Sequence, residues 1–458
     1  MAQLTGSIVK YPARNLVVWY LGLIAAGTFV LTLSMSRGSG AESITLIDAI
    51  FTATSASCVT GLAVRSTPHD FSFIGQLAIL FLIQVGGIGI MTITTFTMFN
   101  LGNRPSLRAR AILTETLGAS DGADLRWILQ HVLIVTAVSE GIGFVILLAR
   151  NLFLYDPGKA AWHALFHSIS AFCNAGFALH DDSLVSFQGD VVVNVTISAL
   201  IIVGGIGFPV LLDLNKNWRR GPVEGWINLH IHSKFMLFGT AFLLLAGFFG
   251  FLLLEWDGIL YEMPLGKKLL VSAFHSVTCR TAGFNTIDLA SLTNATLFIS
   301  MMLMLIGAGS CSTGGGFKVS TVMVMALHAW KTFHGASRIN VARRTIPGEV
   351  IQAATATALL FSVVAIAALT LLLVIEQSGT PHPKSQGLFL DAAFEVVSAL
   401  GTVGLSTGFT GTLSNMGKMI IIVLMFLGRI GPISVFAALS MTERKTLVEY
   451  PKEEPLIG

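Results

Sequence analysis

Four short segments of the chain each lead, through small and polar residues, to a single glycine. They begin at Phe51, Phe166, Phe274 and Phe394 and read FTATSASCVTGLA, FHSISAFCNAGFA, FHSVTCRTAGFNT and FEVVSALGTVGLST. In three of them the glycine lies ten residues after the phenylalanine, and the third segment is one residue shorter. Glycine adopts backbone angles that other residues avoid, so it can aim neighbouring carbonyl oxygens at a common axis.

The tetrapeptides around these glycines are predicted to form a ring of backbone carbonyls. Such a ring can replace the water shell of a dehydrated monovalent cation. No carboxylate lies within any tetrapeptide, which argues against a divalent-cation filter with its acidic ring. The predicted ligands are the carbonyls of Val59, Thr60, Gly61 and Leu62; Asn174, Ala175, Gly176 and Phe177; Thr281, Ala282, Gly283 and Phe284; and Thr402, Val403, Gly404 and Leu405.

A glycine-rich stretch is the second group of residues with a predicted role. It reads GAGSCSTGGGFK from Gly307 to Lys318, inside an otherwise apolar segment. Three consecutive glycines cost a helix about 1 kcal/mol each relative to alanine, so we expect the helix to break here. Non-helical backbone at membrane depth must face protein or a water-filled cavity. The alternative is an interface of small residues between packed helices.

Arg429 lies in the motif GRIG, where two earlier motifs read GGIG. A charged side chain inside a span usually faces a cavity and has a function. We expect Arg429 to face the pore and to act with the glycine-rich stretch as a barrier to cations; the alternative is an anchor for the carbonyls of that stretch. The predicted gate comprises Gly309, Ser310, Cys311, Ser312, Thr313, Gly314, Gly315, Gly316, Lys318 and Arg429.

Other polar residues near the glycine segments are given structural roles. Arg280 is expected to brace the third tetrapeptide against an acidic side chain such as Glu395 or Asp391. His163 and His167 are four residues apart on one predicted helix and could share a zinc ion. A packing role is favoured for both, because His275 stands where His167 does in the next segment and no zinc-protease glutamate lies between them.

The glycine segments belong to a fourfold internal repeat. Their glycines are separated by 115, 107 and 121 residues. A second landmark follows each glycine by 24 to 28 residues: GGIG from Gly86, GGIG from Gly204, GAGSCSTGGG from Gly307 and GRIG from Gly428. Two landmarks at matched offsets indicate four copies of one structural unit.

Each repeat has a long apolar segment, a short one and a second long one. The first members cover roughly 15–35, 125–149, 231–254 and 350–375, and the last cover roughly 73–99, 190–214, 295–330 and 415–440. These lengths reach the ~20 residues that cross a bilayer. The middle members are too short to cross it. They cover roughly 43–57, 160–173, 266–280 and 388–400. The predicted fold is an all-α polytopic membrane protein with eight spans and four re-entrant pore helices in pseudo-fourfold arrangement.

The predicted repeats divide the chain at residues 1–118, 119–224, 225–340 and 341–446, with a tail at 447–458.

Hydrophobic residues make up 53% of the chain and charged residues 12%, against roughly 25% charged in soluble domains. The N-terminus, the loops between repeats and the tail hold 17 of the 28 lysines and arginines, which places both termini in the cytoplasm. The net charge of +3 does not indicate nucleic-acid binding.

The four segments and the stretch GAGSCSTGGGFKVST resemble the Ktr/Trk/HKT superfamily of potassium transporters, and the whole chain is most similar to the bacterial KtrB-type subunit. The resemblance implies a potassium uptake pore in the cell membrane, with a selectivity filter at the tetrapeptides, a gating loop at 307–316 and an influence of sodium. Gly61 resembles the potassium-selective members, since sodium-preferring plant relatives carry serine there.

The resemblance also implies partners. KtrB-type subunits are homodimers on a cytoplasmic ring of nucleotide-binding RCK subunits, so ATP or ADP is expected on the ring and no cofactor on this chain. Basic residues in the predicted cytoplasmic loops could dock the ring or bind anionic lipids.

An intramembrane enzyme and a coupled secondary transporter are the two alternative functions. An intramembrane enzyme needs a nucleophile with a base or paired carboxylates, and no such group is evident. A sodium- or proton-coupled secondary transporter usually has inverted repeats, whereas successive repeats here share one orientation; coupling stays an alternative.

Overall fold

The computed structural model describes residues 12–100, 125–335, 339–341, 344–377, 379, 381–385 and 387–431. The predicted tail at 447–458 and the predicted boundary at 118 lie outside these residues. The described chain is helical apart from one antiparallel pair of short strands, β1 (Asn340–Val341) and β2 (Arg344–Thr345). The predicted helical class is therefore confirmed.

Helices of three kinds follow one another along the chain. The first long helices are α2 (Pro12–Thr32), α7 (Leu125–Asn151), α12 (Ile231–Leu254) and α16 (Gly348–Gln377). The short helices, here called the pore helices, are α3 (Leu46–Ser57), α8 (Pro157–Phe172), α13 (Leu265–Thr278) and α17 (Leu388–Gly401). The closing helices are α5 (Phe73–Asn100), α9 (Val191–Ile206) with α10 (Phe208–Trp218), α14 (Asn294–Leu305) with α15 (Val319–Phe333), and α18 (Asn415–Ile430).

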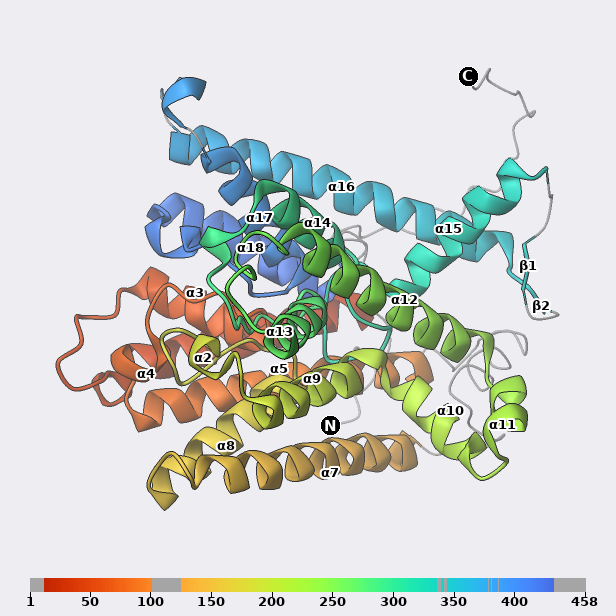
Figure 1. Ribbon diagram of the computed structural model, residues 1–458, viewed down its shortest axis with the longest axis horizontal. Helices are drawn as coiled ribbons and strands as arrows, with labels where there is room; N and C mark the ends of the chain where they lie inside the picture. The colour runs from red at the N-terminus through yellow and green to blue at the C-terminus, as the bar shows by residue number, and fades with distance from the viewer. Residues whose placement is uncertain are drawn as a thin grey trace, which may run out of the picture.

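Shorter elements connect these helices at the two ends of the molecule. They include α4 (Thr67–Asp70), α11 (Pro222–Asn228) and 3-10 turns at Ser34–Ser36, Val185–Phe187, Leu289–Ser291, His382–Lys384 and Phe409–Thr412. Figure 1 shows α4 at one end of the long direction and α10, α11, β1 and β2 at the other. The long helices α7 and α16 run along opposite sides, with α13, α17 and α18 between them.

The outer helices have lengths and surfaces suited to a bilayer. In the described chain, three helical segments are long and apolar enough to span it: Gln130–Asn151, Ile231–Leu254 and Gly348–Gln377. The bent pair of α9 and α10 adds a fourth candidate, and Leu16–Thr32, Phe73–Gly89 and Asn294–Leu305 are shorter apolar helices. Apolar side chains such as Ile142, Phe242 and Ile366 lie exposed on the outer helices. Such a surface is stable against lipid.

The pore helices are too short to span the membrane. At 1.5 Å per residue, the 12 residues of α3 cover about 18 Å and the 16 residues of α8 about 24 Å, against roughly 30 Å of hydrocarbon. They are buried at the centre, where Phe51, Phe166, Phe274 and Phe394 are each at most 1% exposed. The phenylalanine that marks each repeat in the sequence therefore anchors its pore helix in the core.

The closing segment of the second repeat was expected to be one long apolar span over roughly residues 190–214, and the structure divides it into two helices joined by a sharp bend. The chain bends by 98° between α9 and α10, where Gly207 has a φ of +100°. Pro209 lacks a backbone N–H and cannot donate to the carbonyl of Gly205 four residues earlier. That carbonyl accepts from the N–H of Gly309 instead, at 2.8 Å. Hydropathy stays high through the bend and so gives no sign of it.

The helix in the closing segment of the third repeat is interrupted at the glycine-rich stretch, as predicted. Residues between α14 and α15 are not helical, and Ile306 and Phe317 pair as a short parallel bridge. The N–H of Gly307 donates to the carbonyl of Phe317 at 2.8 Å, which closes the base of the loop. We call residues 307–317 the central loop.

Candidate functional site

The four repeat glycines meet in a closed ring. A Cβ atom at Gly61 would lie 3.0 Å from the Cα of Gly176, and one at Gly176 would lie 3.0 Å from the Cα of Gly283. The series continues from Gly283 to the Cα of Gly404 at 3.2 Å, and from Gly404 back to the Cα of Gly61 at 3.0 Å. Each pore helix ends shortly before its own glycine. The chain therefore brings four segments, separated by more than a hundred residues each, around one axis.

The backbone of each tetrapeptide is left-handed at two positions. The glycines have φ of +95°, +70°, +79° and +92° in chain order. The first residues, Val59, Asn174, Thr281 and Thr402, also have positive φ, between +50° and +67°. This conformation is uncommon outside glycine and unfavourable for β-branched residues. Unusual backbone angles were predicted for the glycines but not for the first residues, and the repeated strain indicates a functional constraint.

A hydroxyl on each pore helix holds the tetrapeptide that follows it. Ser55 and Ser398 accept hydrogen bonds from the N–H groups of Gly61 and Gly404, both at 3.1 Å. In the other two repeats the hydroxyl donates to the carbonyl of the residue after the glycine: Ser170 to Phe177 at 2.8 Å and Thr278 to Phe284 at 2.6 Å. These residues were not predicted, although each lies at the same position in its repeat, four residues after the phenylalanine.

Removal of one of these hydroxyls should destabilise the ring. Thr278 is 1% exposed and bonds the carbonyl of Phe284. We expect Thr278→Ala to lower the free energy of unfolding by about 1–3 kcal/mol relative to Thr278→Ser, because the buried carbonyl loses its donor. Thermal unfolding of the two purified variants measures the difference, and since both lack the methyl group, equal stability would rule out the brace.

A cavity opens onto the ring. Its volume is about 460 Å³, and all four glycines, Gly61, Gly176, Gly283 and Gly404, contribute to its lining. Arg65 and Asp181 also line this cavity. An ion in this cavity would therefore reach the four glycine turns together.

The central loop packs directly against the entry residues of two tetrapeptides. The hydroxyl of Thr402 accepts from the N–H of Gly315 at 3.1 Å. A Cβ atom at Gly314 or Gly315 would overlap the hydroxyl of Thr281 or Thr402 respectively. Because the loop backbone lies so close to these threonines, only glycine fits at Gly314 and Gly315. This explains the consecutive glycines at 314–316.

The predicted gate residues fall into two groups. Gly309, Ser312, Thr313, Gly314, Gly315 and Gly316 are buried, and Ser310, Cys311 and Lys318 are partly exposed. The loop also bonds the end of α9, since the N–H of Thr313 donates to the carbonyl of Gly204 at 3.2 Å. Three repeats therefore contact the loop: the second through α9, the third by its own chain and the fourth through Thr402.

Arg429 is buried, and each of its three guanidinium nitrogens donates a hydrogen bond. Nη2 donates to the carbonyl of Gly86 at 2.7 Å, Nη1 donates to the carbonyl of Thr313, and Nε donates to the hydroxyl of Tyr20 at 3.1 Å. Lys318 also bonds the loop, with Nζ 2.8 Å from the carbonyl of Gly314. These contacts are those of an anchor for the loop, the alternative considered for Arg429.

Arg280 does not form the predicted ion pair. Glu395 accepts from the hydroxyls of Ser406 and Thr410, and Asp391 accepts from that of Thr407. Within the described chain, Arg280 is 7% exposed, pairs with neither carboxylate, and its Nε has no hydrogen-bond partner. The prediction failed because both acids are satisfied by hydroxyls of their own repeat.

The glycines of the second landmark let the closing helices approach the pore helices. A Cβ atom at Gly86 would overlap the carbonyl of Ser57, one at Gly204 the carbonyl of Phe172, and one at Gly428 the carbonyl of Leu400. Each of these carbonyls lies at the end of its pore helix. The landmark therefore marks the same close contact in three repeats, and the third repeat has the central loop instead.

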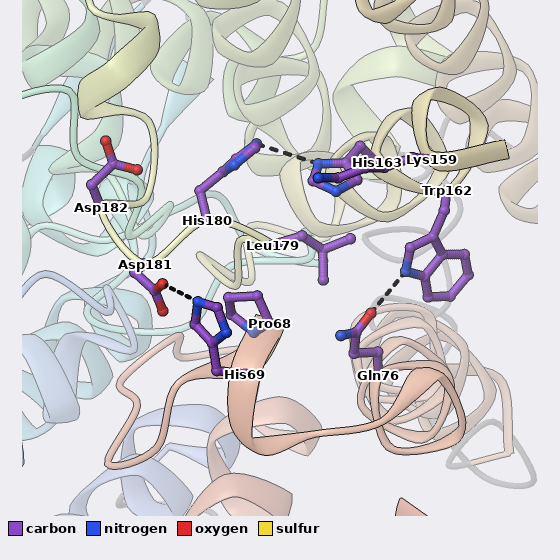
Figure 2. Close-up of a pocket in the computed structure, with 10 residues that line it drawn as sticks. All are labelled: Pro68, His69, Gln76, Lys159, Trp162, His163, Leu179, His180, Asp181 and Asp182. Carbon is purple, nitrogen blue, oxygen red and sulfur yellow. Dashed lines mark hydrogen bonds and ion pairs between the residues drawn. The ribbon is translucent and has the colours of Figure 1, made fainter. Parts of the chain in front are cut away.

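The histidines differ in their surroundings. His275 packs against Phe251 with ring centroids 4.3 Å apart, and its Nε2 lies 2.9 Å from the hydroxyl of Ser300. The packing role expected there is consistent with these contacts. His163 and His167 instead lie beside His180, a residue that the sequence did not bring to them. Figure 2 shows the rings of His163 and His180 directed at each other among the residues that line a second cavity.

Comparison with known proteins identifies the family. A family model described as TrkH, cation transport protein, matches residues 19–450. The Ktr system potassium uptake protein B of Vibrio alginolyticus is 38% identical, over 97% of this chain and 94% of that protein. The protein of the same name from Bacillus subtilis and the potassium/sodium uptake protein NtpJ of Enterococcus hirae are each 36% identical, over 98% of this chain and 97% of theirs.

A solved structure shares the fold. The potassium transporter TrkH from Vibrio parahaemolyticus superposes with a TM-score of 0.73 at 19% identity, over 93% of this chain and 84% of that one. The relatives are ion transporters, so the chain is a membrane transport protein and not an enzyme. With residues 19–450 matched by the family model and full-length relatives at 36–38% identity, the chain belongs to the TrkH family of cation transport proteins.

Proposed function

We propose that this chain is the pore-forming subunit of a potassium uptake system. The ring of four glycines opening on one cavity carries the proposal. Main-chain carbonyls around such a ring can replace the water shell of potassium. The tetrapeptides Val59–Leu62, Asn174–Phe177, Thr281–Phe284 and Thr402–Leu405 are the proposed filter, and inward flow is driven by membrane voltage at about 2.3 kcal/mol per charge per 100 mV.

The names of the relatives support this choice of ion. Two are called potassium uptake proteins and a third a potassium/sodium uptake protein. Sodium would then influence transport or be carried alongside. The proposed architecture is four membrane–pore–membrane repeats with both termini in the cytoplasm, and the cavity at the ring would face outward.

The central loop is the proposed gate. It packs below Thr281 and Thr402, the first residues of the third and fourth tetrapeptides. Arg429 and Lys318 hold it by hydrogen bonds to its carbonyls. The charge of Arg429 would also repel a passing potassium ion, so the barrier proposed for Arg429 and its anchoring contacts are compatible.

A regulatory partner is proposed as well. The name Ktr system, carried by two relatives, implies more than one component. A cytoplasmic nucleotide-binding ring would dock on the predicted cytoplasmic side, where Arg219 and Arg220 are exposed between α10 and α11. A homodimer is the proposed state of this subunit, with anionic lipid as the competing ligand of the basic loops.

Uptake in a host that lacks its own potassium transporters tests the proposed activity. We expect the chain to restore rubidium uptake that potassium suppresses at lower concentration than sodium does. Proton- or sodium-coupled transport would instead stop when the corresponding gradient is removed at constant voltage. Rubidium uptake no greater than in an empty-vector host would refute the proposal.

The Gly61→Ser variant tests the filter assignment. A Cβ atom at Gly61 would lie 2.5 Å from the carbonyl oxygen of Ala175 and must displace it. We expect the preference for potassium over sodium to fall about tenfold, which corresponds to about 1.4 kcal/mol. Competition of each ion against rubidium uptake measures the ratio, and an unchanged ratio would remove Gly61 from the filter.

A further inference from the structure

Three histidines converge beside the second cavity, the one drawn in Figure 2. His163 and His167 lie one turn apart on the pore helix α8, and His180 lies three residues beyond the second tetrapeptide. The Nδ1 of His163 is 3.3 Å from the Nε2 of His180 (Figure 2). One ring nitrogen from each histidine lies within 4.8 Å of the other two.

The hydrogen bonds of His167 fix its tautomer and leave one ring nitrogen without a proton. Nδ1 of His167 lies 2.8 Å from the carbonyl of His163 and donates to it, so Nε2 is the nitrogen with the lone pair. A backbone carbonyl that fixes the tautomer in this way is the usual outer partner of a metal-binding histidine. The present partner of Nε2 is the N–H of Leu179 at 3.3 Å, a long bond that a metal ion would replace.

An ion can reach the cluster from outside. A cavity of about 570 Å³ is lined by His163 and His180 and by the carboxylates of Asp181 and Asp182. Lys159 also lines it, but its ammonium lies over the ring of Tyr155, 4.9 Å from the centroid. Imidazole nitrogens and carboxylate oxygens are both ligands that zinc accepts.

We propose that His163, His167 and His180 form a binding site for Zn²⁺. Tetrahedral zinc with Zn–N distances of about 2.0–2.1 Å sets its ligand nitrogens about 3.3 Å apart, the separation seen between His163 and His180. The three nitrogens lie at most 4.8 Å apart, and small rotations of the side chains can bring them to this separation. The fourth position faces the cavity, where water or a carboxylate can complete the shell.

The site would join two parts of the second repeat. His180 belongs to the segment that leaves the tetrapeptide, whereas His163 and His167 belong to the helix that enters it. Bound zinc would therefore hold both ends of that tetrapeptide together. The inference stands on the histidine geometry alone and does not depend on which ion the glycine ring passes.

Titration of the full-length chain in nanodiscs with ZnCl₂ tests the site, after removal of bound metal by a chelator. Calorimetry should show one Zn²⁺ per chain, and His163→Gln, His167→Gln and His180→Gln should each weaken binding at least about tenfold, the least that disturbing a metal site typically costs. His69→Gln is the matched control, because His69 lines the same cavity but pairs with Asp181 at 2.7 Å, and it should bind zinc as the wild type does.

Two further measurements guard against misfolded variants. His180→Cys replaces one ligand by another that zinc accepts, so it should retain binding. X-ray absorption at the zinc edge of the wild type should show nitrogen ligands at about 2.0 Å. Absence of stoichiometric binding, undiminished affinity in all three glutamine variants, or displacement of zinc by excess Mg²⁺, which prefers oxygen ligands, would overturn the proposal.

Discussion

Replacing Gly283 by alanine is expected to reduce potassium uptake at least about 100-fold, a change in barrier of about 2.7 kcal/mol. Gly283 has a φ of +79°, and a Cβ atom there would lie 3.1 Å from the Cα of Gly176 and 3.2 Å from the Cα of Gly404. The left-handed conformation alone costs a non-glycine residue about 1–2 kcal/mol. The neighbours are backbone atoms, so relief requires the tetrapeptides themselves to move.

Gly141→Ala is the matched control for this variant. Gly141 lies on α7, and a Cβ atom there would meet nothing within 4 Å. We expect wild-type uptake, with stability unchanged or raised by up to about 1 kcal/mol because alanine favours the helix. Rubidium uptake normalised to membrane-inserted protein compares the two. Near-normal uptake by Gly283→Ala would show that the ring does not carry the ion.

Replacing Arg429 by alanine is expected to raise the maximal uptake rate about tenfold. The central loop loses its hydrogen bond to the carbonyl of Thr313, so it can leave its place below the tetrapeptides. The change also removes a positive charge; at roughly 10 Å and an effective dielectric constant of about 20, one charge repels a cation by about 1.7 kcal/mol. Both effects act in the same direction. Initial rates of rubidium uptake at saturating concentration measure the result.

Arg429→Lys separates the two causes. Lysine retains the charge but cannot reproduce the fork of donors that contacts Tyr20, Gly86 and Thr313. If charge dominates, this variant should transport slowly like the wild type, and if anchoring dominates, it should transport fast like Arg429→Ala. An Arg429→Ala protein that inserts normally and transports at the wild-type rate would contradict both roles.

Much of the helical framework could be predicted because it depends on local composition. The segment expected at 231–254 is α12 (Ile231–Leu254), and that expected at 388–400 is α17 (Leu388–Gly401). The length of each apolar segment and the glycines that lie beside it determine these boundaries. The repeated landmark indicated the repeats but did not predict the close approach of Gly86 to the carbonyl of Ser57.

The features that were missed depend on distant contacts. The bend at Gly207 is stabilised by a loop a hundred residues later, through Gly309. The left-handed backbone at Val59 contradicts the ordinary preference of valine and is imposed by the surrounding ring. His180 joins His163 only because the chain turns back over its own pore helix after the second tetrapeptide.

Anomalous diffraction from the protein with rubidium or thallium in place of potassium tests the central claim most directly. The heavy ion should lie on the axis enclosed by Gly61, Gly176, Gly283 and Gly404, within coordination distance of main-chain oxygens from all four segments. Occupied density elsewhere in the molecule with none on that axis would show that the four glycine turns do not bind the permeating ion.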